Sequence, residues 1–310
     1  MIESLLSHQV KSSFDFENRQ WVKVGPSSGS QLQAAAVTVD GVPYIFGGRN
    51  FSNGYSFNAA KKYVNGEFIP IANLPVGLME PGYVAVGRKI YLIGGTTRLV
   101  SGYESRKVYI YDVDTDSYST GADCPTASLV GCATAVGTDI YLYGGLVDQN
   151  ESNNQKIFYK YDTVADQWTV LPYHDSYGYY STFICSLGNR LFTFGGESSN
   201  AGIKDGTLRV YDTFDQTWST PVIEGSKPIA RAGHGVKISE TQFLILGGRT
   251  SGFHGYSSEC WLFDRRTMGW TKLANYPGGI GFQNMAAFNG RVLCFDGYNG
   301  SVVPGTYELI

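Results

Sequence analysis

An apolar run that ends in two glycines recurs along this chain, and this repeat limits the possible folds more than any other feature. The copies read YIFGG, YLIGG, YLYGG, FTFGG, LILGG and LCFDG. They end at Gly48, Gly95, Gly145, Gly196, Gly248 and Gly297. Successive copies are thus 47, 50, 51, 52 and 49 residues apart, and Asp296 replaces the first glycine of the sixth. A period of about 20–50 residues indicates a solenoid, a propeller or an array.

The residues around each glycine pair predict four strands per copy. A tight-turn signal such as Asp40-Gly41 precedes the pair, and two-residue loops of this kind join antiparallel strands into hairpins. A third strand ends in an aromatic residue, usually with Asp after it, as in Tyr161-Asp162. A fourth, short strand carries another aromatic residue, in successive copies Phe68, Tyr118, Trp168, Trp218 and Trp270. Six such units predict an all-β, six-bladed propeller.

The order of glycine pair, tyrosine and tryptophan resembles the kelch repeat family, whose members fold as β-propellers. The resemblance covers roughly residues 14–310, nearly the whole chain. It implies a single six-bladed kelch-type propeller over residues 13–310, with four antiparallel strands per blade, after an N-terminal tail of residues 1–12. We interpret the glycines as sites of close approach between blades, and the repeated Tyr and Trp as packing between them. The Asp after Tyr is expected to bind turn amides.

The two ends of the chain predict how the ring closes. The sixth copy has two strands near residues 281–288 and 291–295 and a third within NGSVVPGTYELI, but no fourth. Near the N-terminus, Phe14-Asp15 stands seven residues before Trp21, which is the spacing of the third-strand and fourth-strand aromatics elsewhere. An open ring would leave unpaired sheet edges. We therefore expect residues near 19–24 to complete the last blade beside the C-terminal strand.

Composition and charge narrow the range of partners. The net charge is −3 and no Lys/Arg run of the kind that follows phosphates occurs, so we expect no nucleic-acid partner. No run of about eighteen apolar residues predicts a membrane span. The start, MIESLLSHQVKSS, lacks the features of a secretory signal, and five widely spaced cysteines fit reduced thiols. We expect a cytoplasmic monomer without a cofactor or a metal.

Function in a propeller is expected in the loops at the ends of the central channel. Here the loops after the glycine pairs and the loops entering each first strand share one face. Counting sixteen residues back from the first glycine position, with the second copy offset by about one, predicts a near-axis ring of Gln31, Leu78, Ser128, Tyr179, Arg231 and Ile280. Tyr and Arg are the usual anchors of interfaces. The residues predicted to bind a partner are Arg49, Asn50, Arg98, Tyr179, Arg231, Arg249, Phe282, Tyr298 and Asn299.

The resemblance also implies a chemistry for these loops. Kelch domains of ubiquitin-ligase adaptors commonly place Arg there to bind acidic peptide motifs, and Arg49-Asn50 is similar to that arrangement. Arg231 followed by Gly233 resembles its first-strand counterpart, although those relatives repeat this element in most blades and here one copy keeps it. An arginine can hold a carboxylate through two parallel hydrogen bonds. We therefore expect a non-catalytic module that binds a protein or peptide, with an acidic motif as one form of that ligand.

A carbohydrate-active enzyme or a lectin is the alternative function. Kelch-like sugar epimerases exist, and Glu197, Arg249 and His254 would supply the polar side chains on the same face. Such a protein requires a deep polar pocket with converging carboxylates, whereas a partner-binding face is shallow and rimmed by aromatic residues. The sequence leaves both functions open, with the interaction module favoured.

Overall fold

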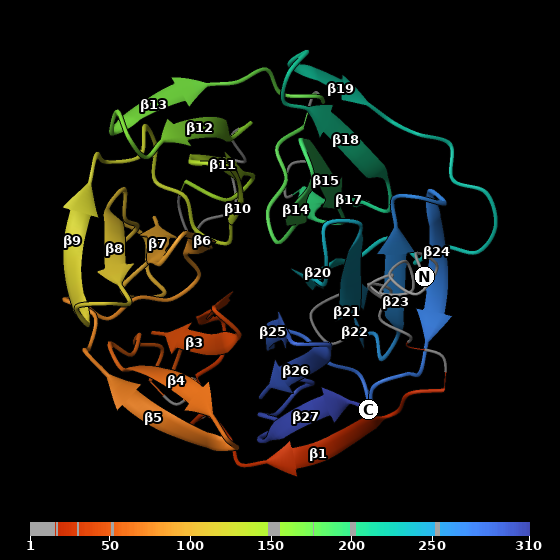
Figure 1. Cartoon of the computed structure of the whole chain (residues 1–310), viewed down its shortest axis with the longest axis horizontal. Helices are drawn as coiled ribbons and strands as arrows, with labels where there is room; N and C mark the ends of the chain where they lie inside the picture. The colour runs from red at the N-terminus through yellow and green to blue at the C-terminus, as the bar shows by residue number, and fades with distance from the viewer. Residues whose placement is uncertain are drawn as a thin grey trace, which may run out of the picture.

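The computed structural model describes residues 16, 18–29, 31–50, 53–147, 156–175, 177–198, 203–251 and 255–310. In these residues, six antiparallel sheets stand in a ring around a central channel (Figure 1). This arrangement confirms the six-bladed propeller predicted from the repeat. No helix in this part of the chain is long and apolar enough to cross a membrane. The predicted boundary between a tail and the propeller at residues 12 and 13 lies outside the described residues.

The strands of each blade follow one another outward from the channel in chain order, and we number the blades 1 to 6 by their innermost strands. The innermost strands are β2 (Ala35–Val39), β6 (Gly82–Val86), β10 (Cys132–Val136), β14 (Phe183–Leu187), β20 (Ala232–Lys237) and β25 (Asn284–Phe288). The second strands are β3 (Val42–Phe46), β7 (Lys89–Ile93), β11 (Asp139–Tyr143), β15 (Arg190–Phe194), β21 (Gln242–Ser251) and β26 (Arg291–Phe295).

The third and outermost strands of each blade carry the aromatic residues of the repeat. The third strands are β4 (Ala60–Val64), β8 (Val108–Asp112), β12 (Phe158–Asp162), β18 (Leu208–Asp212), β23 (Cys260–Asp264) and β27 (Thr306–Leu309). The outermost strands are β5 (Glu67–Ile71), β9 (Ser117–Gly121), β13 (Gln167–Val170), β19 (Thr217–Ser219), β24 (Gly269–Leu273) and β1 (Trp21–Gly25). Short strands extend the loops of blades 4 and 5: β16 (Glu197–Ser198), β17 (Ile203–Lys204) and β22 (Gly255–Tyr256).

The ring closes inside blade 6, as the chain ends predict. β1 pairs antiparallel with β27, and Trp21 stands opposite Leu309. The buried carboxylate of Asp296 holds this closure: its Oδ2 accepts hydrogen bonds from Ser28 N (2.9 Å) and Ser28 Oγ (2.5 Å), and its Oδ1 accepts one from Gly305 N (2.8 Å). The residue that breaks the glycine repeat therefore joins the N-terminal segment to the last blade. Phe14 and Asp15, the expected third-strand end, lie outside the described residues.

The glycine pair marks the point where each blade meets the next. In blade 2, Gly95 N donates a 2.7 Å hydrogen bond to the carbonyl oxygen of Ser128 in blade 3. Gly94 has a φ of +70°, and a Cβ there would lie 2.2 Å from that same oxygen. Such an approach excludes any side chain. The repeated glycines are therefore required by the contact between blades, which explains why they recur at the same place in the repeat.

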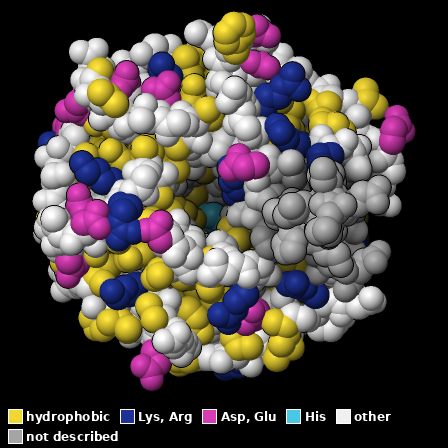
Figure 2. Space-filling model, in the orientation of Figure 1, with side chains coloured by type: hydrophobic (Ala, Val, Ile, Leu, Met, Phe, Trp, Pro, Cys, Tyr) yellow, Lys and Arg dark blue, Asp and Glu magenta, His cyan; other side chains and the backbone are white. Residues whose placement is uncertain are grey.

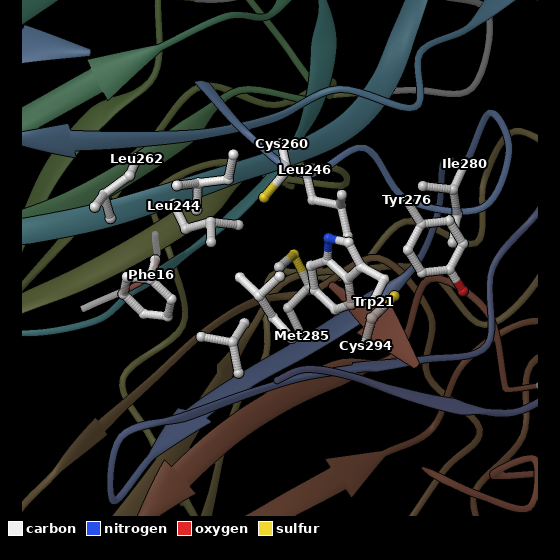
Figure 3. Close-up of a cluster of buried hydrophobic side chains, with 13 residues drawn as sticks. Phe16, Trp21, Leu244, Leu246, Cys260, Leu262, Tyr276, Ile280, Met285 and Cys294 are labelled. Carbon is white, nitrogen blue, oxygen red and sulfur yellow. The ribbon is translucent and has the colours of Figure 1, made fainter. Parts of the chain in front are cut away.

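Apolar side chains fill the seam between every two neighbouring blades, and each seam has its own cluster of buried residues. Figure 3 shows the seam between blades 5 and 6, where Trp21 from β1 lies among Leu246, Cys260 and Met285. The ring of Trp21 packs edge-on against Tyr276 at 5.4 Å between centroids. The closing strand thus contributes apolar burial as well as backbone pairing.

The fourth-strand aromatic residues also hydrogen-bond across the seams. Three of them donate to the carbonyl oxygen of the residue 46 positions earlier, at the end of the preceding blade. The pairs are Tyr118 Oη to Ala72 (2.9 Å), Trp168 Nε1 to Ala122 (2.9 Å) and Trp218 Nε1 to Pro172 (2.8 Å). The Asp after the third-strand aromatic accepts turn amides, as Asp162 does from Val164 and Ala165. These contacts agree with the interpretation of the repeated Tyr, Trp and Asp.

Candidate functional site

A ring of hydrogen-bonded backbone surrounds the channel mouth on the loop face. One residue per blade takes part, at the start of the first strand or just before it; we call these six the rim ring. Its members are Gln33, Glu80, Val130, Ser181, Gly233 and Phe282. Glu80 N donates to Gln33 O, and Val130 N donates to Glu80 O, both at 2.9 Å. Five such bonds link five of the six pairs of neighbouring blades, and they fix the backbone from which the side chains of the mouth project.

The channel forms a hollow at the centre of the ring (Figure 2). A cavity of about 90 Å³ lies at the mouth and is lined by residues that include Glu80, Tyr83, Cys132 and His234. Burial lowers the pKa of His234 to about 4, so its imidazole is neutral at neutral pH. Burial also raises the pKa of Tyr83 to about 12. The upper channel is therefore a small space without a charged histidine.

Three aromatic side chains gather at one side of this mouth. Tyr256 on β22, Phe282 of the rim ring and Tyr298 after β26 have their ring centroids 6.0 Å apart in each pair. All three are half-buried, and we call them the aromatic triad. Edge-to-face contacts at this distance stabilise aromatic groups beyond their apolar burial. The triad therefore presents a preformed apolar surface between blades 5 and 6.

Two arginines bring positive charge to the triad. Arg249 forms an ion pair with Glu197, and Lys204 approaches the same carboxylate at 3.3 Å. Burial raises the pKa of Tyr256, while the charges of Arg249 and Arg49 act to lower it. Burial lowers the pKa of Arg49, against the opposing effect of Glu80 and of two triad tyrosines. Both guanidinium groups thus lie within electrostatic reach of the triad.

A third arginine stacks between two tyrosines of blades 1 and 2. The guanidinium of Arg98 lies 4.6 Å from the ring centroid of Tyr55 and 5.7 Å from that of Tyr103. Each tyrosine is 46% exposed. We call this group the tyrosine clamp. Cation–π contacts hold Arg98 in place at the outer part of the loop face.

The structure brings together only some of the residues predicted to bind a partner. Arg49, Arg249, Phe282 and Tyr298 meet at the channel mouth, and Arg98 stands apart in the tyrosine clamp. The other loop residues lie on the same side of the blades: Asn50 N donates to Tyr55 O (2.8 Å), and Asn299 is exposed.

Arg231 and Tyr179 lie inside the protein, unlike the near-axis position expected for them. Arg231 is 1% exposed; its guanidinium donates to Gly247 O (2.9 Å) and pairs with Glu259 (2.7 Å). Tyr179 is buried beneath the guanidinium of Arg209, which lies 5.6 Å from its ring centroid. Both side chains support the loop from within, so they are not part of the exposed surface.

The whole predicted near-axis ring lies beneath the surface, because the rim ring comes two residues later in each copy. Gln31 Nε2 donates to Gly47 O and Ser128 Oγ donates to Gly144 O, each sixteen residues ahead, as Arg231 does to Gly247 O. The spacing from the glycines therefore identifies a contact within the blade that recurs in three copies of the repeat. Positive φ at a residue such as Val130 has no sequence signal, and for that reason Gln33 and Val130 were missed.

Of the polar residues expected for a carbohydrate enzyme, two lie together. Glu197 and Arg249 form the ion pair described above. The carboxylate of Glu197 thus has two cationic partners, Arg249 and Lys204. His254 lies outside the described residues. Among the residues that the structure describes, no three His, Cys, Asp or Glu side chains group as metal ligands would.

Comparison with known proteins agrees with this architecture. The family model for the KLHDC2/KLHL20/DRC7 Kelch-repeats domain matches residues 82–297. Kelch-like protein 25 from Xenopus tropicalis is 26% identical over 243 residues, which cover 76% of this chain and 39% of that protein. Kelch-like protein terF from Aspergillus terreus is 26% identical over 300 residues, covering 89% of this chain and 62% of that one.

An enzyme also occurs among the relatives. The N-(sulfonatooxy)prop-2-enimidothioate sulfolyase of Thlaspi arvense is 28% identical over 199 residues, which cover 60% of this chain and 53% of that protein. The chain thus spans between about two fifths and three fifths of the length of these curated relatives.

Proposed function

Because the chain belongs to the kelch-repeat family, we propose that it is a non-catalytic module that binds a protein or peptide segment across its loop face. Kelch repeats typically serve as protein-interaction modules. The observation that carries the proposal is the aromatic triad at the rim of the channel mouth, with Arg49 beside it. Tyrosine and arginine dominate binding energy where they cluster near the centre of an interface. Rings that are already packed lose little conformational entropy when a ligand binds.

The charge around the triad favours an acidic group in the ligand. Arg49, Arg249 and Lys204 carry three positive charges, against two negative charges on Glu80 and Glu197. The surplus of one positive charge lies next to apolar rings, where water screens it less than on an open surface. An acidic side chain of the bound segment would therefore gain from lying over the triad. The tyrosine clamp supplies a second contact region farther from the axis.

Substitutions at the channel mouth test this proposal. Tyr298→Ala and Arg49→Ala should each remove the partner in affinity purification with mass spectrometry from the native source. Phe214→Ala is the matched control, because Phe214 is 88% exposed in the turn between β18 and β19, at the opposite end of the blade. Phe214→Ala should melt close to the wild type, as surface substitutions do. Arg49→Ala and Tyr298→Ala change half-buried side chains, so circular dichroism first checks that both variants are folded. Recovery of the same proteins with all three variants would reject the loop face as the binding site.

A carbohydrate ligand or substrate is the second candidate. The Thlaspi arvense relative is named as a sulfolyase, so this repeat architecture also occurs in an enzyme. Aromatic rings beside the Glu197–Arg249 pair could stack on a sugar and hydrogen-bond its hydroxyls. A glycan array probed with the wild type and with Tyr298→Ala distinguishes the two functions, because an interaction module gives no Tyr298-dependent glycan signal. Cytoplasmic location and a monomeric state remain predictions from the sequence.

A further inference from the structure

The loop between β26 and β27 carries an Asn–Gly pair directly after a residue of the aromatic triad. Asn299 and Gly300 follow Tyr298, and a β-bridge between Tyr298 and Val302 closes a tight turn around them. The turn residues Asn299, Gly300 and Ser301 are all exposed. In an Asn–Gly pair the backbone nitrogen of the glycine can attack the neighbouring side-chain carbonyl within the same molecule, and glycine has no Cβ to hinder the attack. The turn therefore holds a reactive pair beside the channel mouth.

The backbone nitrogen of this pair is not restrained. Within the part of the chain that the structure describes, Gly300 N donates no hydrogen bond, so no such bond has to break before it moves. A Cβ added at Gly300 would meet no atom within 4 Å, so the residue is not packed against a neighbour. Ser301 Oγ lies 3.5 Å from Asn299 Oδ1, where its hydroxyl can polarise the amide carbonyl that is attacked. The nucleophile is thus unrestrained, and the carbonyl is exposed and polarised.

Three other Asn–Gly pairs occur in the sequence, and contacts restrain each of them. The first is Asn53–Gly54 in the loop of blade 1. Gly54 N donates a 2.9 Å hydrogen bond to Asn50 O, and Asn53 Oδ1 accepts one from Tyr55 N at 3.0 Å. The nitrogen that would attack is therefore already engaged in this pair.

The remaining two pairs, residues 65–66 and 289–290, are two-residue turns between paired strands. Strand pairing begins directly on both sides of each turn, and the φ angles of Asn65 and Asn289 are +52° and +48°. Ring closure has to rotate the peptide bond after the asparagine, which would break this pairing. The amide of Asn289 also lies against blade 1, since a Cβ at Gly41 would be 2.9 Å from its Nδ2. The contacts therefore favour reaction at Asn299 over the other three pairs.

We propose that Asn299 is a site of spontaneous deamidation in the folded protein, and that its product weakens the binding of an acidic ligand. Gly300 N attacks Asn299 Cγ and a new C–N bond closes a cyclic imide. The bond from Cγ to the side-chain nitrogen breaks, water carries the proton of Gly300 N to that nitrogen, and ammonia leaves. A second water opens the ring at one carbonyl to give aspartate or at the other to give isoaspartate. No oxidant, reductant or enzyme takes part.

Either product adds a negative charge next to Tyr298. The described charges around the triad leave a surplus of one positive charge, which the new carboxylate cancels. Isoaspartate also lengthens the main chain beside the two hydrogen bonds, of 2.8 and 2.9 Å, that join Tyr298 to Gly281. This effect on binding rests on the proposed function, whereas the reaction at Asn299 does not.

Peptide mapping by mass spectrometry tests the reaction without any partner. Trypsin releases residues 292–310 as one peptide, in which Asn299 is the only asparagine. After incubation of the folded protein at mildly alkaline pH, we expect this peptide to show the loss of ammonia and then the mass of the acid. An isoaspartate methyltransferase should methylate the incubated protein, and the rate should rise with pH because the attacking nitrogen must lose its proton. In urea all four pairs should react at similar rates. Asn299 that reacts no faster than Asn53, Asn65 or Asn289 in the folded protein overturns the proposal.

Affinity purification from the native source tests the effect on binding. Asn299→Asp should recover about fivefold less of the Tyr298-dependent partner than Asn299→Gln, the effect of about 1 kcal/mol between charges at a protein surface. Incubated wild type should recover less partner than fresh wild type, whereas incubated Asn299→Gln should match its own fresh sample. Equal recovery with Asn299→Asp and Asn299→Gln overturns the effect on binding, even where the mass shows the reaction. If the wild type recovers no partner that depends on Tyr298, the proposed function fails, and the mass alone decides the modification.

Discussion

Replacing Asp296 by glycine is the sharpest test of how this ring closes. Five of the six repeats have glycine at this position, so the pattern of the repeat alone favours Asp296→Gly as neutral or stabilising. The structure predicts the opposite. The buried carboxylate accepts three hydrogen bonds, two from Ser28 and one from Gly305, and these hold the N-terminal segment against blade 6.

The expected loss follows from these contacts. Each hydrogen bond to a charged group contributes about 1.5–3 kcal/mol, and we take about 1 kcal/mol per lost bond because water can enter the vacated space. The φ of Asp296 is +49°, so glycine relieves some backbone strain but also gains freedom in the unfolded chain, and these effects roughly cancel. We therefore expect a loss of about 3 kcal/mol, or about 5 °C in melting temperature for a chain of this length.

Thermal and urea unfolding followed by circular dichroism measure this loss. Asp296→Asn is the matched control, because it keeps one acceptor oxygen and the size of the side chain, and its effect should be intermediate. Ser28→Ala combined with Asp296→Gly should cost less than the sum of the two single changes, since both remove the bond from Ser28 Oγ to Asp296. An Asp296→Gly protein that melts at or above the wild-type temperature refutes this account of the closure.

Three other predictions follow from the described contacts. Gly94→Ala places a Cβ against the carbonyl oxygen of Ser128 and should cost more than about 3 kcal/mol, seen as low soluble yield and a lower urea midpoint. Burial disfavours the ionised form of Glu259, but hydrogen bonds from Arg231 and its neighbours outweigh this effect and lower the pKa of Glu259 to about 2. The free energy of unfolding should therefore decrease as pH falls from about 4.5 towards 2. A Glu259→Gln variant should show a smaller change in urea midpoint over that range. Burial raises the pKa of Cys132 to about 12, so its thiol should react slowly with a disulfide reagent at pH 8 until the protein unfolds.

The sequence predicts the ring well because its strongest signals are contacts between blades. A glycine such as Gly94 cannot be replaced without a clash with the next blade, and an indole such as Trp168 needs an acceptor in the preceding one. The glycine contact is made at five seams and the aromatic hydrogen bond at three, so the same residue types return at the same spacing. The closing strand was predictable for the same reason, since Trp21 keeps the position of a fourth-strand aromatic.

The loop face was harder to predict because residue type alone does not tell which way a loop side chain points. The residue type of Arg231 predicts an interface anchor. In the structure, Arg231 instead donates a hydrogen bond to the carbonyl oxygen of the glycine sixteen residues ahead, as Gln31 and Ser128 do in other blades. Five of the six rim-ring residues have positive φ, which Val130 adopts without any signal in the residue type. Because the members of the triad are aromatic, their residue type allows them to be predicted as binding residues. Their contact at the mouth cannot be predicted in this way, because it depends on the path of the loops.

Departures from the repeat are where this chain differs from a symmetric ring, and their physical consequences differ in kind. Asp296 replaces a glycine and adds hydrogen bonds that join the two ends of the chain. Pro221 has no N–H to donate at the place where Leu171 donates to Phe158 O in blade 3, and the indole of Trp270 lies at the same seam. The first change satisfies polar groups, and the second leaves one unsatisfied. A stabilising role explains the first change, whereas the second leaves a buried indole donor unpaired among the described residues and costs stability.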